Sequence, residues 1–179
     1  GWGGDPGVAF DRTGKVYSIG ISIGDEEFAI GPLVAFLNIS SIFITSSADG
    51  GFNWAEPIDT IRSGLTSDTQ DDAEGRTRGS VRLSFLDKPW LSIGPNPTNK
   101  DKDNLYITYT DFEESFQIYY IGEQPILGLP RLETTIRMVR SEDGGKSWSD
   151  PVDVSPTVLL EFGGRGSANS MAPVRQNGI

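Results

Sequence analysis

The side chains that could do chemistry in this chain are arginines, tyrosines and carboxylates, because the sequence contains neither His nor Cys. Their absence excludes Ser-His-Asp catalysis, cysteine nucleophiles and zinc bound by thiolate or imidazole. Any acid–base chemistry must then use Asp, Glu, Tyr or Lys. A guanidinium group can bind an anion bidentately. Four arginines in segments that we expect to be long loops are candidates for such a role, namely Arg76, Arg78, Arg82 and Arg165.

One of these segments also combines tyrosines with glutamates, namely Glu113, Glu114, Tyr119 and Tyr120. A tyrosine beside a glutamate can act as a nucleophile with its partner, but nothing in the spacing places such a pair in contact. Arg76 and Arg78 follow an acidic run at 71–74. The alternative interpretation of these two arginines is therefore that they are solvated loop charges.

Two aspartates, Asp5 and Asp87, stand near the start of two related strand segments, each close to a proline. We expect them at matching places, where they could point toward a central channel and bind a sugar hydroxyl or a cation. The alternative is that each carboxylate accepts hydrogen bonds within its own turn, which is the commoner role for Asp at such positions.

The most conspicuous pattern is a turn that occurs twice, at 47–54 and 141–148, with the form Ser-x-Asp-Gly-Gly-x-(Asn/Ser)-Trp. Its Asp can accept hydrogen bonds from turn amides, its Gly pair permits positive φ, and its Trp supplies apolar area. We therefore expect a structural role for Ser47, Asp49, Gly51, Trp54, Ser141, Asp143, Gly145 and Trp148. Calcium is the alternative, but one or two carboxylates per turn fall short of the about six to eight oxygens it takes. No metal or other cofactor is predicted.

Each turn belongs to a larger repeat of short strands. The segments 15–22 and 104–111 alternate apolar with polar or small residues, which is typical of strands, and further strands are expected on both sides of each turn. Four antiparallel strands per unit predict an all-β chain with the plan of a β-propeller blade. The single domain 1–179 then holds about two blades, at 5–63 and 87–155, a connecting loop at 64–86, and a loop with the start of a third blade at 156–179.

The two turns resemble the Asp-boxes, or bacterial neuraminidase repeats, of sialidase-like β-propellers, and the inner strand pair within 87–111 is similar to that of many secreted proteins of this type. The resemblance covers nearly the whole chain and implies the propeller fold, but Asp-boxes also occur in non-catalytic propellers. A sialidase-type site uses an arginine cluster, a Tyr nucleophile with a Glu partner, and an Asp acid/base. The Arg-Ile-Pro motif that commonly carries the first arginine is absent from this sequence.

Three functions follow from this resemblance. The first is a non-catalytic, secreted propeller that binds a glycan or a protein through its long loops. The second is a fragment of a sialidase-type exo-glycoside hydrolase, and the third is a self-assembling lectin. In propellers of this kind the Asp-box turns lie on the face opposite to the ligand. The segments expected on the ligand face are 1–5, 22–40, 64–88, 111–134 and 156–172.

Charge and hydrophobicity narrow the expected partners. A net charge of −10 disfavours nucleic acid and anionic membranes, and the longest apolar run, 28–37, is too short to span a membrane. The apolar segments 28–37, 116–121 and 125–130 either cover the blade tops or form a patch for a partner protein or ligand.

The number of units also bears on the partners. Two blades cannot close a ring, since propellers use about four to eight. The chain stops where a further hairpin is expected to start. We therefore expect a fragment of a six-bladed propeller whose remaining blades are its partners, located outside the cell or at its surface. Assembly of three copies into a ring is the alternative.

Overall fold

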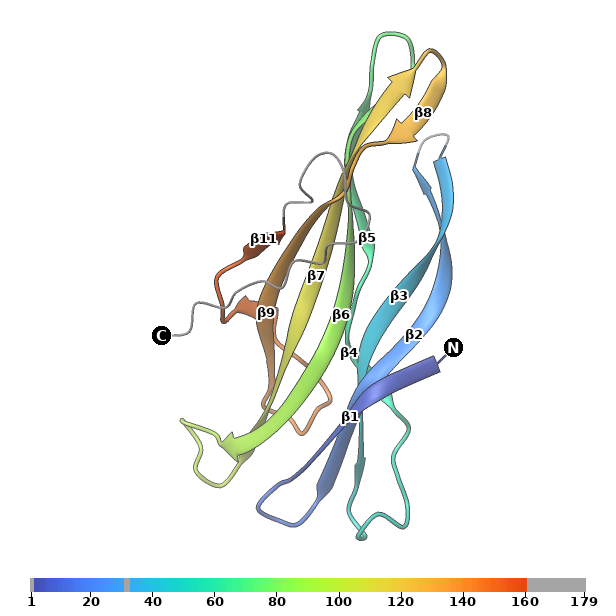
Figure 1. Ribbon diagram of the computed structural model, residues 1–179. Helices are drawn as coiled ribbons and strands as arrows, with labels where there is room; N and C mark the ends of the chain where they lie inside the picture. The colour runs from blue at the N-terminus through green and yellow to red at the C-terminus, as the bar shows by residue number, and fades with distance from the viewer. Residues whose placement is uncertain (1, 31–32, 161–179) are drawn as a thin grey trace.

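The computed structural model describes residues 2–30 and 33–160, and within these ranges the chain consists of antiparallel β-strands without any helix. The all-β class predicted from the sequence is confirmed. In the described part, no helix is long and apolar enough to cross a membrane. The strands form two sheets that lie against each other, and the larger sheet is strongly twisted (Figure 1).

The first sheet is a meander in which each strand pairs with the next along the chain. It contains β1 (Trp2–Phe10), β2 (Val16–Ile30), β3 (Leu33–Ser47) and β4 (Ile58–Arg62), in that order. The long β2–β3 ladder runs without interruption from Val16 opposite Ser47 to Ile30 opposite Leu33.

The second sheet repeats this plan and adds short strands. Its meander contains β6 (Thr77–Pro95), β7 (Asp103–Ile121), β9 (Arg131–Ser141) and β10 (Val152–Asp153). The additional strands are β5 (Leu65–Asp71), which pairs with β6, β8 (Gln124–Leu127), which pairs with β7, and β11 (Val158–Leu160), which pairs with β9.

The segments expected to be long loops are mostly strand, so that expectation is wrong for 22–40, 64–88 and 111–134. They form the extended ends of β2 and β3, the β5–β6 hairpin, and the far ends of β7 and β9 with β8. The physical reason is that apolar, β-prone residues in these segments satisfy their backbone polar groups best by continuing the ladder. Exposed side chains such as Phe36 and Leu129 show that these segments do not simply fold back as a cover.

The core lies between the facing surfaces of the two sheets. The first sheet contributes Tyr17, Ile19, Ile42 and Ile44, and the second contributes Leu86, Leu91, Leu105, Ile107, Tyr109 and Val139. These residues alternate along their strands with residues of the opposite face, as a half-buried strand requires. The short connections that hold the repeated turns lie at one end of the molecule, and the extended hairpins lie at the other (Figure 1).

Candidate functional site

The repeated turns are held by hydrogen bonds of the expected kind. In the first turn, the Asn53 amide donates to Asp49 Oδ1 at 2.9 Å and the Gly51 amide donates to Ser47 Oγ at 2.9 Å. Gly50 and Gly51 have φ values of 78° and 92°, a region that favours glycine. The Trp54 indole closes the turn by donating to the Gly51 carbonyl oxygen at 3.0 Å.

The second turn repeats these contacts almost bond for bond. The Ser147 hydroxyl and amide and the Lys146 amide all donate to Asp143, and the Gly145 amide donates to Ser141 Oγ. The bonds to Asp143, first of all from the Ser147 hydroxyl, hold the pKa of its carboxyl well below the usual range. Because the acceptor capacity of Asp143 is used by its own turn, the geometry supports a structural role for this residue.

Three of the sequence-predicted residues, Arg76, Arg78 and Tyr120, come together near the tip of the β5–β6 hairpin. The guanidinium carbons of Arg76 and Arg78 lie 5.7 and 5.3 Å from the centre of the Tyr120 ring. Both arginines also donate to Asp72 Oδ2, at 3.1 and 2.6 Å. Arg76 also pairs with Glu74 Oε2 at 2.8 Å, so two carboxylates balance the two positive charges, which agrees with the interpretation of Arg76 and Arg78 as loop charges.

The other predicted tyrosine and arginines are not part of this cluster. Tyr119 is exposed on β7, and its ring lies against the chain at Gly128. Arg82 lies further along β6, within 4.0 Å of Glu113. Arg165 lies outside the described residues.

The expected match between Asp5 and Asp87 is wrong by one position, because Asp5 corresponds to Lys88. Both residues precede a proline, both have φ near 50°, and both lie where a bulge interrupts the pairing of β1 or β6. Lys88 Nζ donates to both Asp5 carboxylate oxygens at 3.2 Å. Asp87 Oδ1 accepts the Lys88 amide at 2.9 Å, as the capping alternative predicts.

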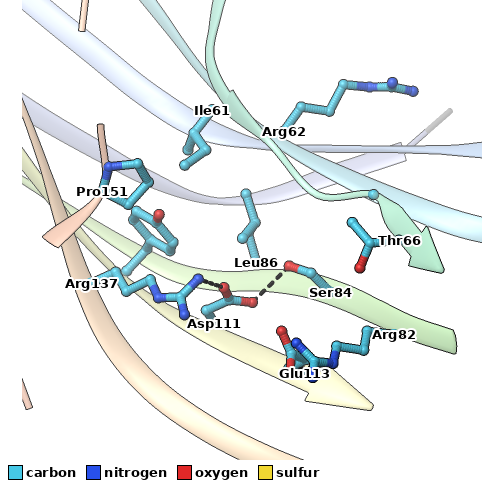
Figure 2. A pocket seen from close by; sticks show the side chains of 12 residues that line it. Ile61, Arg62, Thr66, Arg82, Ser84, Leu86, Asp111, Glu113, Arg137 and Pro151 are labelled. Atoms are coloured by element: carbon cyan, nitrogen blue, oxygen red, sulfur yellow. Dashed lines mark hydrogen bonds and ion pairs between the residues drawn. The ribbon is translucent and has the colours of Figure 1, made fainter. Parts of the chain in front are cut away.

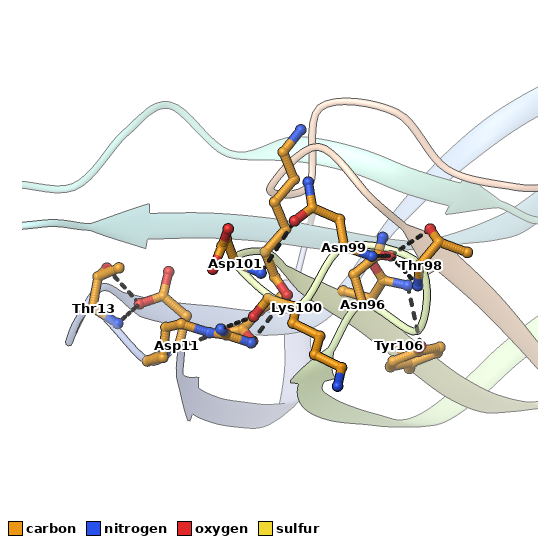
Figure 3. A network of polar contacts seen from close by, with 12 residues as sticks. Asp11, Thr13, Asn96, Thr98, Asn99, Lys100, Asp101 and Tyr106 are labelled. Atoms are coloured by element: carbon orange, nitrogen blue, oxygen red, sulfur yellow. Dashed lines mark hydrogen bonds and ion pairs between the residues drawn. The ribbon is translucent and has the colours of Figure 1, made fainter.

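Polar contacts also join the hairpin turns at the end of the molecule that carries the repeated turns (Figure 3). Arg12, between β1 and β2, donates through Nε to Asp103 Oδ1 at 2.8 Å and through Nη2 to the Lys102 carbonyl oxygen at 3.0 Å. The adjacent turn is organised by Asn96, whose Oδ1 accepts the Thr98 and Asn99 amides. In the described ranges, no group of three or more acidic side chains is arranged to hold a metal ion.

A cavity of about 320 Å³ opens between the two sheets, and we call it the inter-sheet pocket (Figure 2). Five strands contribute residues to its lining, so no single stretch of sequence could predict the pocket. Its lining residues are Ile61, Arg62, Gly64, Thr66, Arg82, Ser84, Leu86, Tyr109, Asp111, Glu113, Arg137 and Pro151.

A buried carboxylate, Asp111 on β7, organises the polar wall of this pocket. Its Oδ2 accepts Arg137 Nη1 at 2.6 Å, and its Oδ1 accepts the Ser84 hydroxyl at 2.7 Å (Figure 2). Arg137 also donates through Nε to Asp153 Oδ1 at 3.0 Å. The guanidinium is thus held in one orientation, as a group that recognises a ligand must be.

The hydroxyl of Tyr109 is buried without a hydrogen-bond partner in the described part of the chain. The residue is only 1% exposed, yet it lines the inter-sheet pocket. Buried polar atoms in proteins are nearly always paired with protein, water or ligand. Burial, and after it the negative charge of Asp111, raises the pKa of this hydroxyl. Tyr109 is therefore a protonated hydrogen-bond donor at neutral pH.

The pocket combines groups that donate with groups that accept. Arg62, Arg82 and Arg137 donate, Glu113 accepts, and Thr66 can do both. A ligand with several hydroxyl groups can use both kinds of partner.

Three of the residues that organise the pocket, Tyr109, Asp111 and Arg137, are absent from the sequence-based candidates. A signal for them did exist. Tyr109 and Asp111 share the parity of buried Leu105 and Ile107 along β7, so their polar groups had to face the interior. A charged residue on the buried face of a strand needs a partner, which Arg137 supplies.

Comparison of the chain with known protein families, with curated proteins and with solved structures finds no match. The resemblance to Asp-box propellers therefore rests on the residues of the two turns and their flanking strands.

Proposed function

We propose that this chain is part of a secreted, non-catalytic β-propeller that binds a glycan in the inter-sheet pocket. The observation that supports a ligand site here is the buried Tyr109 hydroxyl, which has no hydrogen-bond partner among the described residues and lies in a pocket lined by both donors and acceptors. A sugar hydroxyl in reach of Tyr109 would accept a hydrogen bond from its hydroxyl group and remove the cost of leaving a buried donor unpaired.

The propeller architecture is supported by the repetition of one local plan. Each sheet contains a four-stranded meander, each has the same eight-residue turn before its last strand, and the inner strands β1 and β6 share the same bulge. The two meanders pack face to face through mainly aliphatic side chains, as neighbouring blades do.

The choice of a glycan follows from the chemistry of the pocket wall. Arg137 and Arg82 are held beside Asp111 and Glu113, so planar donor and acceptor groups alternate along the wall. Sugar hydroxyls both donate and accept, so a sugar can use the arginines and the carboxylates together, whereas a simple anion could pair only with the arginines. Ile61, Leu86 and Pro151 supply apolar surface for the carbon face of a sugar ring.

The test uses Tyr109→Phe and a matched control, Tyr106→Phe, in saturation-transfer NMR. The probes are glucose, glucuronic acid and N-acetylneuraminic acid. We expect binding of at least one probe, weakened about fivefold or more by Tyr109→Phe because one hydrogen bond is lost. Tyr106, whose hydroxyl accepts from Asn104 Nδ2 at 3.2 Å, lies on the other face of β7, so its variant should bind normally.

Three results would contradict the proposal. The first is no binding of any of these sugars, and the second is equal binding by Tyr109→Phe and wild type. The third is turnover of a fluorogenic sialoside by the chain, which would instead support the sialidase-type hydrolase.

A further inference from the structure

Each sheet has one face in the interface between the sheets and one face that no described strand covers. The repeat makes these faces comparable. Aligning the two turns through Ser47 and Ser141 makes Ile42 equivalent to Ile136 and Ile44 equivalent to Met138. The strand registers extend this alignment, because Tyr17 lies opposite Ser46 and Tyr106 lies opposite Arg140, one position before each turn.

The uncovered face of the second sheet is thus the counterpart of the face that the first sheet buries. Tyr17, Ile42 and Ile44 are buried in the interface between the sheets, whereas the equivalent residues Tyr106, Ile136 and Met138 are not. We call this surface the forward face, and its residues are Trp90, Tyr106, Ile136, Met138 and Val152. Trp90 is 74% exposed, an unusual state for so large an apolar side chain.

The uncovered face of the first sheet is the counterpart of the face that the second sheet buries. Its side chains are Val8, Phe10 and Phe43, and we call it the rear face. Phe10 is 66% exposed. Its equivalent in the second sheet, Ile93, packs against the core. The rear face therefore carries apolar side chains at positions whose equivalents in the second sheet lie in the interface between the sheets.

The tryptophans of the two repeated turns also differ in burial. Trp148 of the second turn packs against the core, and a Cβ added at Gly145 would lie 3.5 Å from Ile44 of the first sheet. The second turn therefore reaches across to the preceding sheet. The equivalent Trp54 of the first turn is 45% exposed and has no such sheet to contact within the described chain.

We propose that a second copy of this chain covers these surfaces, with the forward face of one copy against the rear face of the next. This contact continues the interface that already joins the two sheets, with Trp54 in the role that Trp148 has within the chain. Because the two surfaces differ, the assembly is head-to-tail and closes into a ring when the rotation permits. With two sheets per copy, about two to four copies make a ring of propeller size.

The experiment measures the mass of the chain in solution by light scattering after size exclusion, at micromolar concentration. The wild type should have a mass of a small multiple of 19.4 kDa. Phe10→Lys blocks the rear face and Ile136→Lys blocks the forward face, so each variant alone should be monomeric. An equimolar mixture should form a dimer, because each variant retains the surface that the other lacks. Val34→Lys, on the extended β2–β3 hairpin, is the exposed control and should assemble normally.

A monomeric wild type would overturn the proposal and would favour coverage of these faces by another part of a longer polypeptide. An oligomer that survives both lysine variants would overturn it as well, since the contact would then lie elsewhere. Failure of the mixture to form a dimer would exclude the head-to-tail arrangement.

Discussion

At the scale of single residues, the aspartates of the repeated turns illustrate how local sequence determines local structure. Asp49 accepts bonds from a backbone amide and two side chains within six residues of itself. These bonds, first of all from the Asn53 amide, lower the pKa of Asp49 to about 2. Nothing distant in the chain is needed for this arrangement, which is why its hydrogen bonds could be predicted without a structure.

Asp49→Asn should reveal this arrangement through its dependence on pH. A pKa lowered in the folded state adds stability above the unfolded value of about 3.9, and that stability is lost as the pH falls toward about 2. The variant should therefore melt a few degrees below wild type at pH 6, and this difference should shrink as the pH falls to about 2. Calorimetry at several pH values measures it. A difference that is independent of pH would contradict the assigned role.

At the scale of elements, the extended hairpins are the main departure from the predicted structure. The β5–β6 pair depends on Gly79, which lies opposite Thr69 with φ of 137°. A Cβ at this position would lie 2.1 Å from the Asp68 carbonyl oxygen, a distance that no packing can accommodate. A backbone approach this close is a reason for glycine within a strand.

Gly79→Ala should detach β5 from β6 and lower the free energy of unfolding by about 1–3 kcal/mol. Hydrogen exchange of the amides at 65–71 measures the local effect, and urea denaturation measures the global one. Gly94→Ala is the matched control, because it lies in the same strand and an added Cβ there meets nothing within 4 Å. Equal exchange at 65–71 in both variants would contradict the prediction.

At the scale of the whole molecule, the two sheets share one core and should unfold together. Ile42 of the first sheet and Ile107 of the second are both fully buried in this core. Because the buried apolar side chains of this core come from both sheets, loss of one sheet exposes the buried face of the other. Cooperative unfolding in a single transition is the expected consequence.

Ile42→Ala should lower the free energy of unfolding by about 2–5 kcal/mol, because it leaves a cavity between the sheets. Its repeat equivalent, Ile136, is 45% exposed, so Ile136→Ala should cost about 0.5 kcal/mol in the dilute, unassembled chain. Urea denaturation followed by circular dichroism and by tryptophan fluorescence tests both effects. Equal costs, or two separate transitions, would refute the shared core.

The sequence by itself determined the features that depend on neighbours along the chain. Period-two alternation indicated the strands, and the Ser-x-Asp-Gly-Gly turn indicated its own hydrogen bonds and the repeat. The same reasoning from local sequence led to a wrong prediction for the long connections. The presence of Gly31 and Pro32 favoured a long loop, whereas the pairing of β2 with β3 continues up to Ile30 opposite Leu33.

Only the tertiary structure decided which polar residues meet. Ser84, Asp111 and Arg137 come from three strands and converge because the registers of β6, β7 and β9 align them across the sheet. Whether the Tyr109 hydroxyl finds a partner depends on the opposite sheet and on the pocket between them. Cross-strand register and the packing of sheets are sums of many weak, distant contacts, so no short stretch of sequence contains them.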